Sequence, residues 1–288
     1  MRGKAPRQPA KSGRHESVRA KTANLTAITK VTRPQKKSEA TPGRAQQASG
    51  GKSTTLKKKA IKGYNPVAPE RISDILKRLD QAYPDVTCAL HHRNAWELLV
   101  ATILSAQSTD VNVNRVTPEL FRKYPTVEAF AAITPEQLQP DIYSTGFFRN
   151  KAKSVVGAAK AVVNEFGGQV PDDMEKILTL PGVARKTANV VLGTWFKKAE
   201  GVVVDTHVTR ISRRLELTQS TDAPKIEQDL MKVIPREKWT LFSHQIIWHG
   251  RKLCMARRPN CAECPLENLC HAADKTWSTV EIHASATW

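Results

Sequence analysis

The chain has few acidic and few aromatic residues, and it has no long apolar run. Its 288 residues include 27 Asp or Glu against 45 Lys or Arg, which gives a formal net charge of +18, and aromatic residues make up 6%. No apolar run is long enough for a membrane-spanning helix, and no long segment alternates apolar and polar residues as a half-buried strand does. These absences argue against a membrane-spanning fold and a sheet-based fold. The excess of cations favours a nucleic-acid partner.

The positive charge is concentrated in residues 1–64. This segment has 17 Lys or Arg and two acids, a net charge of +15, which leaves +3 for residues 65–288. It is rich in Lys, Ala, Ser and Thr, so it cannot bury enough apolar surface to offset the entropy of ordering. We therefore predict a disordered basic tail that attracts nucleic acid without reading its sequence. A solubilising extension and an organelle-targeting segment are the alternatives.

Residues 65–288 predict an all-α fold, because apolar residues recur at helical spacing and Pro or Gly separates the helical segments. The segment 95–104 is apolar on nearly all sides and is predicted to be a buried central helix. The turns are expected at Pro125, Pro140, Gly146, 167–168 and 181–182. The helices are expected at residues 69–83, 95–104, 117–122, 126–132, 135–138, 151–166, 172–178 and 185–197.

The sequence LPGVARKTA at residues 180–188 predicts a tight hairpin between two helices. Backbone N–H groups at such a turn point outward at a helix N-terminus and form an anion site that suits a phosphate. Lys186 lies in the first turn of the second helix, where the helix dipole favours an uncharged amine. Asp205 follows 19 residues later, far enough for the chain to return to Lys186. Singly, Lys186 would serve as a phosphate contact and Asp205 as a helix N-cap; together they indicate catalysis.

Four of the five cysteines lie within 17 residues. Cys254, Cys261, Cys264 and Cys270 have the spacing C-x6-C-x2-C-x5-C, and Cys88 stands alone. Thiols this close are poorly placed for two disulfides, so the run predicts a metal site in a reducing compartment. Zinc and an iron–sulfur cluster both take four thiolates, and the residues by themselves leave both open.

The hairpin and the acid that follows it carry a family resemblance. Residues 180–188, with the loop from Gly201 to Asp205, resemble the helix–hairpin–helix motif and Gly…Asp loop of the DNA glycosylase superfamily. Lys186 makes the chain resemble the bifunctional members, and the endonuclease III family most closely, over about residues 65–275. The resemblance implies that Lys186 and Asp205 are catalytic. The chain departs from the family pattern at Ala184, where a second hairpin glycine is usual.

The same resemblance implies two helical lobes that flank a DNA-binding cleft. A six-helix barrel with the hairpin would span residues 89–198, and a cluster-binding lobe would combine residues 65–88 with 199–288. The cysteine spacing is similar to the [4Fe–4S] pattern of endonuclease III at all four positions, so the resemblance assigns the cluster. The loop between the first two cysteines would present Arg257 and Arg258 to DNA phosphates, with a solvated basic rim as the alternative.

Further DNA contacts are implied because a glycosylase must extrude its target nucleotide from the stack. By resemblance, Gln107 would fill the gap that the nucleotide leaves. Phe147, at a position where leucine is common, would wedge into the duplex, while Phe148 is expected to pack against the protein. The resemblance also implies backbone N–H donors at Gly182 and Ala184 of the hairpin. It places Ser105, Asp110 and His207 near the pocket, with His207 as a structural hydrogen-bonding residue.

The resemblance implies a bifunctional DNA glycosylase and AP lyase of base excision repair that removes oxidised pyrimidines through a lysine Schiff base and β-elimination. It implies a monomer that binds duplex DNA with a damaged base or abasic site, in the bacterial cytoplasm near the nucleoid and without a membrane partner. Three alternatives are a mismatch adenine glycosylase, a non-catalytic DNA-binding module and a zinc-stabilised interaction protein. The first is disfavoured because residues 98–105 hold no carboxylate.

Overall fold

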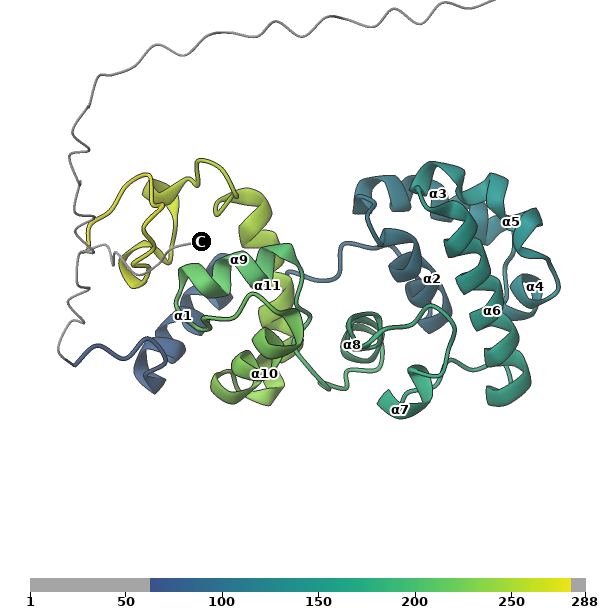
Figure 1. The fold of residues 1–288 in the computed structure, drawn as a ribbon, viewed down its shortest axis with the longest axis horizontal. Coiled ribbons are helices and arrows are strands. Elements are labelled where there is room, and N and C mark those ends of the chain that lie inside the picture. The colour runs from purple at the N-terminus through teal and green to yellow at the C-terminus, as the bar shows by residue number, and fades with distance from the viewer. Residues whose placement is uncertain (1–62, 281–288) are drawn as a thin grey trace, which may run out of the picture. The chain divides into compact units, whose positions relative to one another are not determined.

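The computed structural model describes residues 63–280 of the chain. The predicted basic tail, up to residue 62, lies outside the described residues. The described part is all helical and contains no strand, as the sequence predicts (Figure 1). Its α-helices are α1 Pro69–Ala82, α2 Ala95–Ser105, α3 Asp110–Lys123, α4 Val127–Ala131, α5 Pro135–Ile142, α6 Phe148–Phe166, α7 Met174–Ile177, α8 Arg185–Thr194, α9 Thr206–Arg214, α10 Ala223–Val233 and α11 Trp239–Lys252. Its short 3-10 helices are η1 Tyr143–Thr145, η2 Arg236–Lys238, η3 Cys261–Glu263 and η4 Glu267–Leu269.

Most helices begin where the sequence supplies a capping side chain. An oxygen of the N-cap side chain accepts a backbone N–H of the first turn, and such a cap stabilises a helix by about 1 kcal/mol. At α5 the cap is reciprocal, because the Gln137 side chain also accepts the N–H of Thr134. The capping residues are Asn94, Thr109, Thr126, Thr134, Asp173, Asp205 and Asp222.

Several helices have bounds that differ from the prediction; among them, α6 begins at Phe148 rather than at residue 151, and α7 spans Met174–Ile177 rather than residues 172–178. Helix α3 begins at Asp110 rather than at residue 117, because the Thr109 cap and the burial of Val113 outweigh the weak helix propensity of its first turns. Helix α5 continues through Pro140, where the sequence predicts a turn, because that proline lies in the last turn of a short helix. Helix α8 ends at Thr194 rather than at residue 197, where Lys197 adopts a left-handed φ of 58°.

The first hydrophobic core is built around α2. This helix buries apolar side chains on all sides, including Leu98, Leu99 and Leu104, and each such burial contributes about 1.5–3 kcal/mol. The core continues through α3, α4, α5, α6 and α8, which lie together on the right of Figure 1. Phe148 packs against this core, as the sequence predicts. The core therefore carries both the hairpin before α8 and the loops at the C-terminal ends of α2 and η1.

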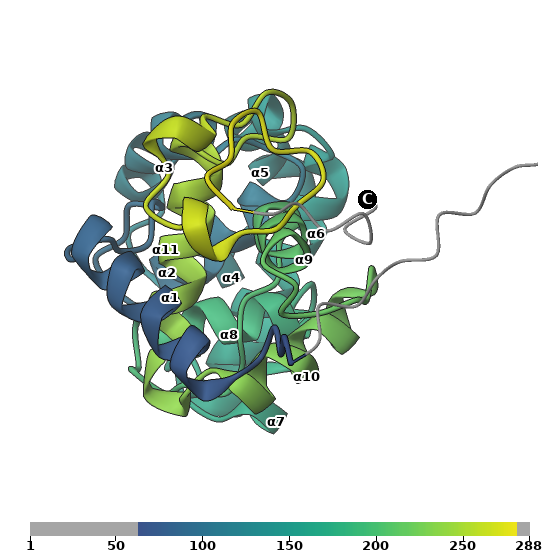
Figure 2. The ribbon, with the colours of Figure 1, turned by 90° about the vertical axis from the view of Figure 1, so that its left-hand side faces the viewer.

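The second hydrophobic core joins the first helix to the last part of the described chain. Helix α1 contributes Ile75 and Leu79 to a core that is otherwise made by residues 202–266. Figure 2 shows α1 beside α11 and the C-terminal segment. Arg71 donates to the carbonyl oxygens of Leu215, at 3.0 Å, and of Leu269, which fixes the start of α1 against that segment. The two cores support the predicted division into two lobes, whose bounds stay a prediction.

Candidate active site and cluster-binding segment

A pocket of about 130 Å³ collects four of the residues that the sequence singles out. These are Lys186, Asp205, Ser105 and Asp110, which come from α8, the start of α9, the end of α2 and the start of α3. The pocket thus brings an amine and carboxylates together from segments that are far apart in the sequence. The remaining lining residues are Val86, Thr87, Cys88, Ala89, Leu90, Thr102, Val190, Val203, His244, Ile247, Trp248 and Arg251.

The hairpin before α8 places Lys186 and exposes backbone donors. Gly182 has φ +78°, and a Cβ there would lie 2.4 Å from the Cβ of Ser154 on α6, so only glycine fits. The Val183 N–H turns inward to the carbonyl of Leu180 at 3.1 Å. Within residues 63–280 the N–H groups of Gly182 and Ala184 have no acceptor, so they are free to bind an anion.

Ala184 does not disturb this hairpin. Its backbone is extended, with φ −97° and ψ 167°, as the N-cap of α8. An alanine adopts this conformation without strain, so the departure from the family glycine leaves the turn intact.

A buried network orients the first turn of α8. Glu227 on α10 is 7% exposed and accepts from Arg185 at 3.0 Å and from Asn189 at 2.8 Å. A Cβ on Gly201 would lie 2.0 Å from a Glu227 carboxylate oxygen, so glycine lets the loop toward Asp205 pass over this network. Because Arg185 is held to α10, the next residue, Lys186, is directed at the pocket.

Asp205 both caps α9 and lines the pocket. Its Oδ1 accepts the backbone N–H groups of His207 and Val208, each at 2.8 Å. Its Oδ2 has no hydrogen-bond partner among the described residues. Asp205 can therefore cap α9 with one carboxylate oxygen and present the other oxygen to the pocket, so the two roles are compatible.

Three residues of the pocket were not found by sequence reasoning. Arg251, at the end of α11, donates to Asp110 at 2.6 Å and forms an ion pair across the pocket. His244 also lines the pocket, and burial lowers its pKa to about 4, so it is neutral at pH 7. Trp248 presents a ring that is 38% exposed. All three come from α11, about 40 residues after Asp205, and no local signal places them in the pocket.

The other predicted site residues lie outside this pocket. His207 is half-buried against Gly250 and Arg210, which fits the structural role expected for it. Gln107 and Phe147 are exposed at the loops that follow α2 and η1. Both have a left-handed backbone, with φ 54° and 49°. Arg257 and Arg258 are exposed in the loop between the first two cysteines of the four-cysteine run.

The four clustered cysteines line one cavity and form no disulfide. Within residues 63–280 no group of three or more His, Cys, Asp or Glu side chains is arranged to hold a single metal ion. The thiols of Cys254, Cys261, Cys264 and Cys270 instead surround a shared space, which is the arrangement that a cluster with a thiolate at each corner needs.

Nitrogen atoms of two side chains lie against two of the sulfurs. Arg214 donates to Cys254 Sγ at 3.1 Å, and His249 Nε2 lies 3.6 Å from Cys264 Sγ. Burial raises the pKa of Cys264 to about 12 and that of Cys270 to about 11. These thiols therefore lose their protons when they bind metal, and the cationic surroundings then stabilise the thiolates. The residues fit an iron–sulfur cluster.

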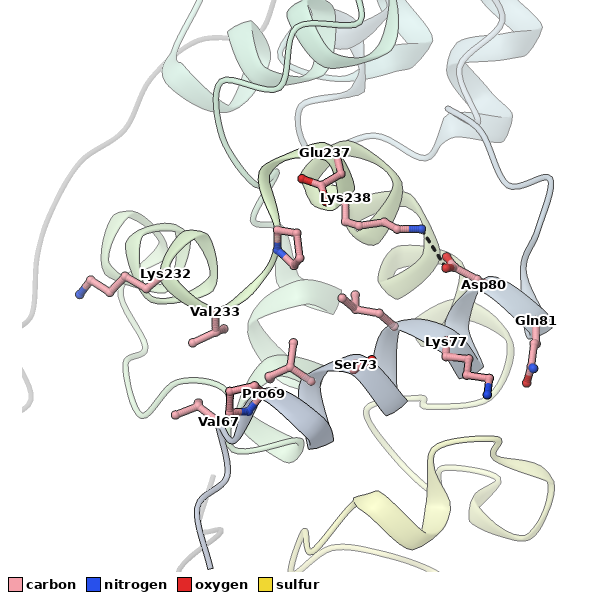
Figure 3. A pocket seen from close by; sticks show the side chains of 13 residues that line it. Val67, Pro69, Ser73, Lys77, Asp80, Gln81, Lys232, Val233, Glu237 and Lys238 are labelled. Carbon is pink, nitrogen blue, oxygen red and sulfur yellow. Dashed lines mark hydrogen bonds and ion pairs between the residues drawn. The ribbon is translucent and has the colours of Figure 1, made fainter.

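A larger pocket, of about 680 Å³, lies between α1 and the segment around η2 (Figure 3). An ion pair of 2.9 Å between Lys238 and Asp80 lies at its edge, and Lys77 and Lys232 stand at its rim. It contains none of the residues that the sequence predicts for catalysis, so size alone does not identify the active site.

Comparison with known proteins agrees with this geometry. Residues 100–236 match the HhH-GPD superfamily of base excision DNA repair proteins, and residues 254–270 match the iron–sulfur binding domain of endonuclease III. Endonuclease III of Synechocystis sp. is 54% identical over 204 residues, 71% of this chain and 93% of the relative. Endonuclease III of Bacillus subtilis is 44% identical over 72% of this chain and 94% of the relative.

Solved structures give the same result. A trapped endonuclease III–DNA covalent intermediate has a TM-score of 0.67 and 42% identity, and covers 70% of this chain and 95% of that chain. A thermostable thymine-DNA glycosylase has a TM-score of 0.60 and 25% identity over 69% of this chain and 93% of that chain.

The helical fold and the hairpin define a helix–hairpin–helix DNA glycosylase of base excision repair. The chain belongs to the endonuclease III family. It is accordingly a DNA-binding N-glycosylase with AP lyase activity, and its cofactor is a [4Fe–4S] cluster. In the described part of the chain, no helix has the length and apolar character needed to cross a membrane.

Proposed function

We propose that the protein removes oxidised pyrimidines from duplex DNA by a bifunctional mechanism in which Lys186 is the nucleophile. The observation that carries the proposal is the shared pocket of Lys186 and Asp205, next to Ser105 and Asp110. The relative captured as a covalent endonuclease III–DNA intermediate supports it, because trapping requires a bond between protein and DNA.

In the first step the Lys186 amine attacks the sugar C1′ of an extruded nucleotide. The C1′–N bond to the damaged base breaks, and its electron pair leaves with the base, which takes up a proton. Asp205 presents a carboxylate oxygen that is not used in capping α9. This oxygen stabilises the positive charge that develops on the sugar and accepts the proton that the lysine loses.

In the second step the sugar ring opens and the amine becomes a Schiff base at C1′. The iminium withdraws electrons and acidifies C2′, so a base removes a C2′ proton. The electron pair forms a C1′–C2′ enamine. The enamine electrons then form a C2′–C3′ double bond as the C3′–O bond breaks and the 3′ phosphate leaves, which restores the Schiff base and cuts the strand 3′ to the lesion. Water then hydrolyses the Schiff base and restores the Lys186 amine.

Lys186 is exposed in the protein alone, whereas the uncharged amine that attacks C1′ is favoured where water is excluded. We infer that the bound duplex covers it and supplies the missing exclusion of water. The enclosure of the amine would thus form only on a nucleotide that has entered the pocket.

The DNA contacts follow from exposed groups. The free N–H groups of Gly182 and Ala184 bind a phosphate, and Gln107 and Phe147 enter the duplex where the nucleotide has left. Cys254, Cys261, Cys264 and Cys270 would hold the cluster, and the loop between the first two of them would carry Arg257 and Arg258 toward phosphates. We propose that the protein acts as a monomer on nucleoid DNA in the cytoplasm.

Borohydride trapping tests the nucleophile. Native protein should give a reduced covalent adduct with a thymine-glycol duplex, and Lys186→Gln should give none, because the amide has no nucleophilic lone pair. Lys160→Gln, which changes an exposed lysine on α6, is the matched control and should trap as native protein does.

An adduct that persists in Lys186→Gln would assign the chemistry to another amine. A duplex with adenine opposite an oxidised guanine tests the mismatch alternative; release of adenine from it, with no release of thymine glycol, would overturn the assignment to pyrimidine lesions.

A further inference from the structure

A buried lysine joins the two loops that carry Gln107 and Phe147. Lys151 on α6 is 5% exposed, and its Nζ donates to the carbonyl oxygens of Leu104 and Thr145, each at 2.8 Å. No carboxylate pairs with it among the described residues. A buried ammonium without a counter-charge is costly, and here burial lowers its pKa. A buried, unpaired lysine is therefore expected where its hydrogen bonds fix the position of other backbone segments.

The two carbonyls are at the ends of the loops. Leu104 lies three residues before Gln107, and Thr145 lies two residues before Phe147. Gln107 and Phe147 both have a left-handed backbone, which non-glycine residues avoid unless their surroundings impose it. Lys151 therefore fixes the segments that force these two side chains into their unusual and exposed conformation.

A second residue links the same loops. The Asn112 amide on α3 donates to the Ser144 carbonyl at 2.9 Å and to the Ser108 hydroxyl at 3.2 Å. The 104–109 segment and the 143–147 segment are thus bridged twice, by Lys151 from the interior and by Asn112 from the surface.

We propose that Lys151 is a positioning residue for DNA: it holds the 104–109 and 143–147 segments at a fixed separation, so that Gln107 and Phe147 enter the duplex as one preformed unit. The inference rests on the proposed function of these two side chains. Preorganised loops lose less conformational freedom on binding than mobile ones, so nucleotide extrusion becomes easier. Lys151 does not line the Lys186 pocket and takes no part in the covalent steps.

The test compares two abasic substrates. Strand cleavage in a duplex requires the loops to replace a nucleotide, whereas cleavage of a single-stranded abasic oligonucleotide does not. Lys151→Met keeps the length of the side chain and removes its donors. We expect single-turnover cleavage of the duplex to fall roughly tenfold to a hundredfold, with the single-stranded reaction within about threefold of native. Lys153→Met, an exposed lysine on the same helix, is the control and should change neither reaction.

Coupling to Phe147 gives a second readout. If Lys151 acts through the wedge, Lys151→Met should add little to Phe147→Ala on the duplex, because the two changes disable the same unit. Equal losses on both substrates, or fully additive losses with Phe147→Ala, would overturn the proposal and leave Lys151 a general stability residue.

Asn112→Ala keeps the test decisive if Lys151→Met fails to fold, since it removes the surface bridge without touching the buried charge. It should show the same selective loss on duplex DNA, and unchanged duplex cleavage would contradict the inference. Failure of the proposed role of Phe147 is distinguishable, because Phe147→Ala alone would then leave duplex cleavage as in native protein.

Discussion

One carboxylate, that of Asp205, has two tasks. Its Oδ1 completes the N-terminus of α9, while Oδ2 is available in the pocket of Lys186. A change at Asp205 can therefore alter the chemistry, the stability of α9, or both. The choice of substitution separates the two effects, because asparagine caps helices as well as aspartate does and alanine does not.

We predict that Asp205→Asn slows base release by on the order of a hundredfold, because it removes the charge that stabilises the sugar cation while keeping the acceptor of the cap. Asp205→Ala should lose the same activity and, in addition, about 1 kcal/mol of unfolding free energy. Single-turnover excision and urea unfolding measure the two effects. Near-native excision by Asp205→Asn would remove this carboxylate from the mechanism.

Residue types with a local signature were predictable, and residues that act through the fold were not. Lys186 and Asp205 were predictable because a hairpin motif and a fixed spacing mark them. Arg251 and His244 reach the pocket from α11. Lys151 binds backbone carbonyls of two loops, and no sequence pattern shows which side chain a backbone carbonyl will bind. Finding such residues requires the packing of helices that are distant along the chain.

At the scale of elements, the hairpin before α8 depends on the close approach of α6. Gly182 sits where a side chain would overlap Ser154, whereas Ala184 has an ordinary extended backbone. The sequence predicts the turn and its helices but not this difference between the two positions. Bounds were least predictable where capping and packing compete with propensity, as at α3, or where a proline falls in a last turn, as at α5.

We predict that Gly182→Ala destabilises the protein by at least about 1–2 kcal/mol, because alanine resists the left-handed conformation and its Cβ overlaps Ser154. Gly182→Ala/Ser154→Gly should recover the part that is due to overlap, and Ala184→Gly should be close to neutral. Urea unfolding checks the three variants. If Gly182→Ala unfolds as native protein does, the hairpin does not require glycine at this position.

At the scale of the whole molecule, charge is divided unevenly. Residues 1–64 carry +15 of the net charge of +18, while the pocket, the hairpin and the cysteine segment lie in residues 63–280. The predicted all-helical fold is confirmed, while the disordered tail that attracts nucleic acid stays a prediction. Attraction to phosphates and placement of the target nucleotide are therefore expected to reside in different parts of the chain.

We predict that removal of residues 1–62 weakens DNA binding and flattens its salt dependence, with the slope of log K against log salt falling by about 0.9 for each phosphate that the tail no longer neutralises. Excision at saturating enzyme should stay within about threefold, because every pocket residue is retained. Binding titrations at several salt concentrations measure the slope. An unchanged slope would show that the tail does not bind DNA.

The shared core of α1 and the C-terminal segments sets an order of events during synthesis. Residues 90–192 contain every member of the first core, so it can close while the ribosome is still adding the rest. The apolar face of α1 finds its partners only among residues 202–266, which are made later. Until then Ile75 and Leu79 on α1 are not covered by the rest of their core. A chain whose synthesis stops before these residues are made would therefore expose an apolar helix face that chaperones or proteases can bind.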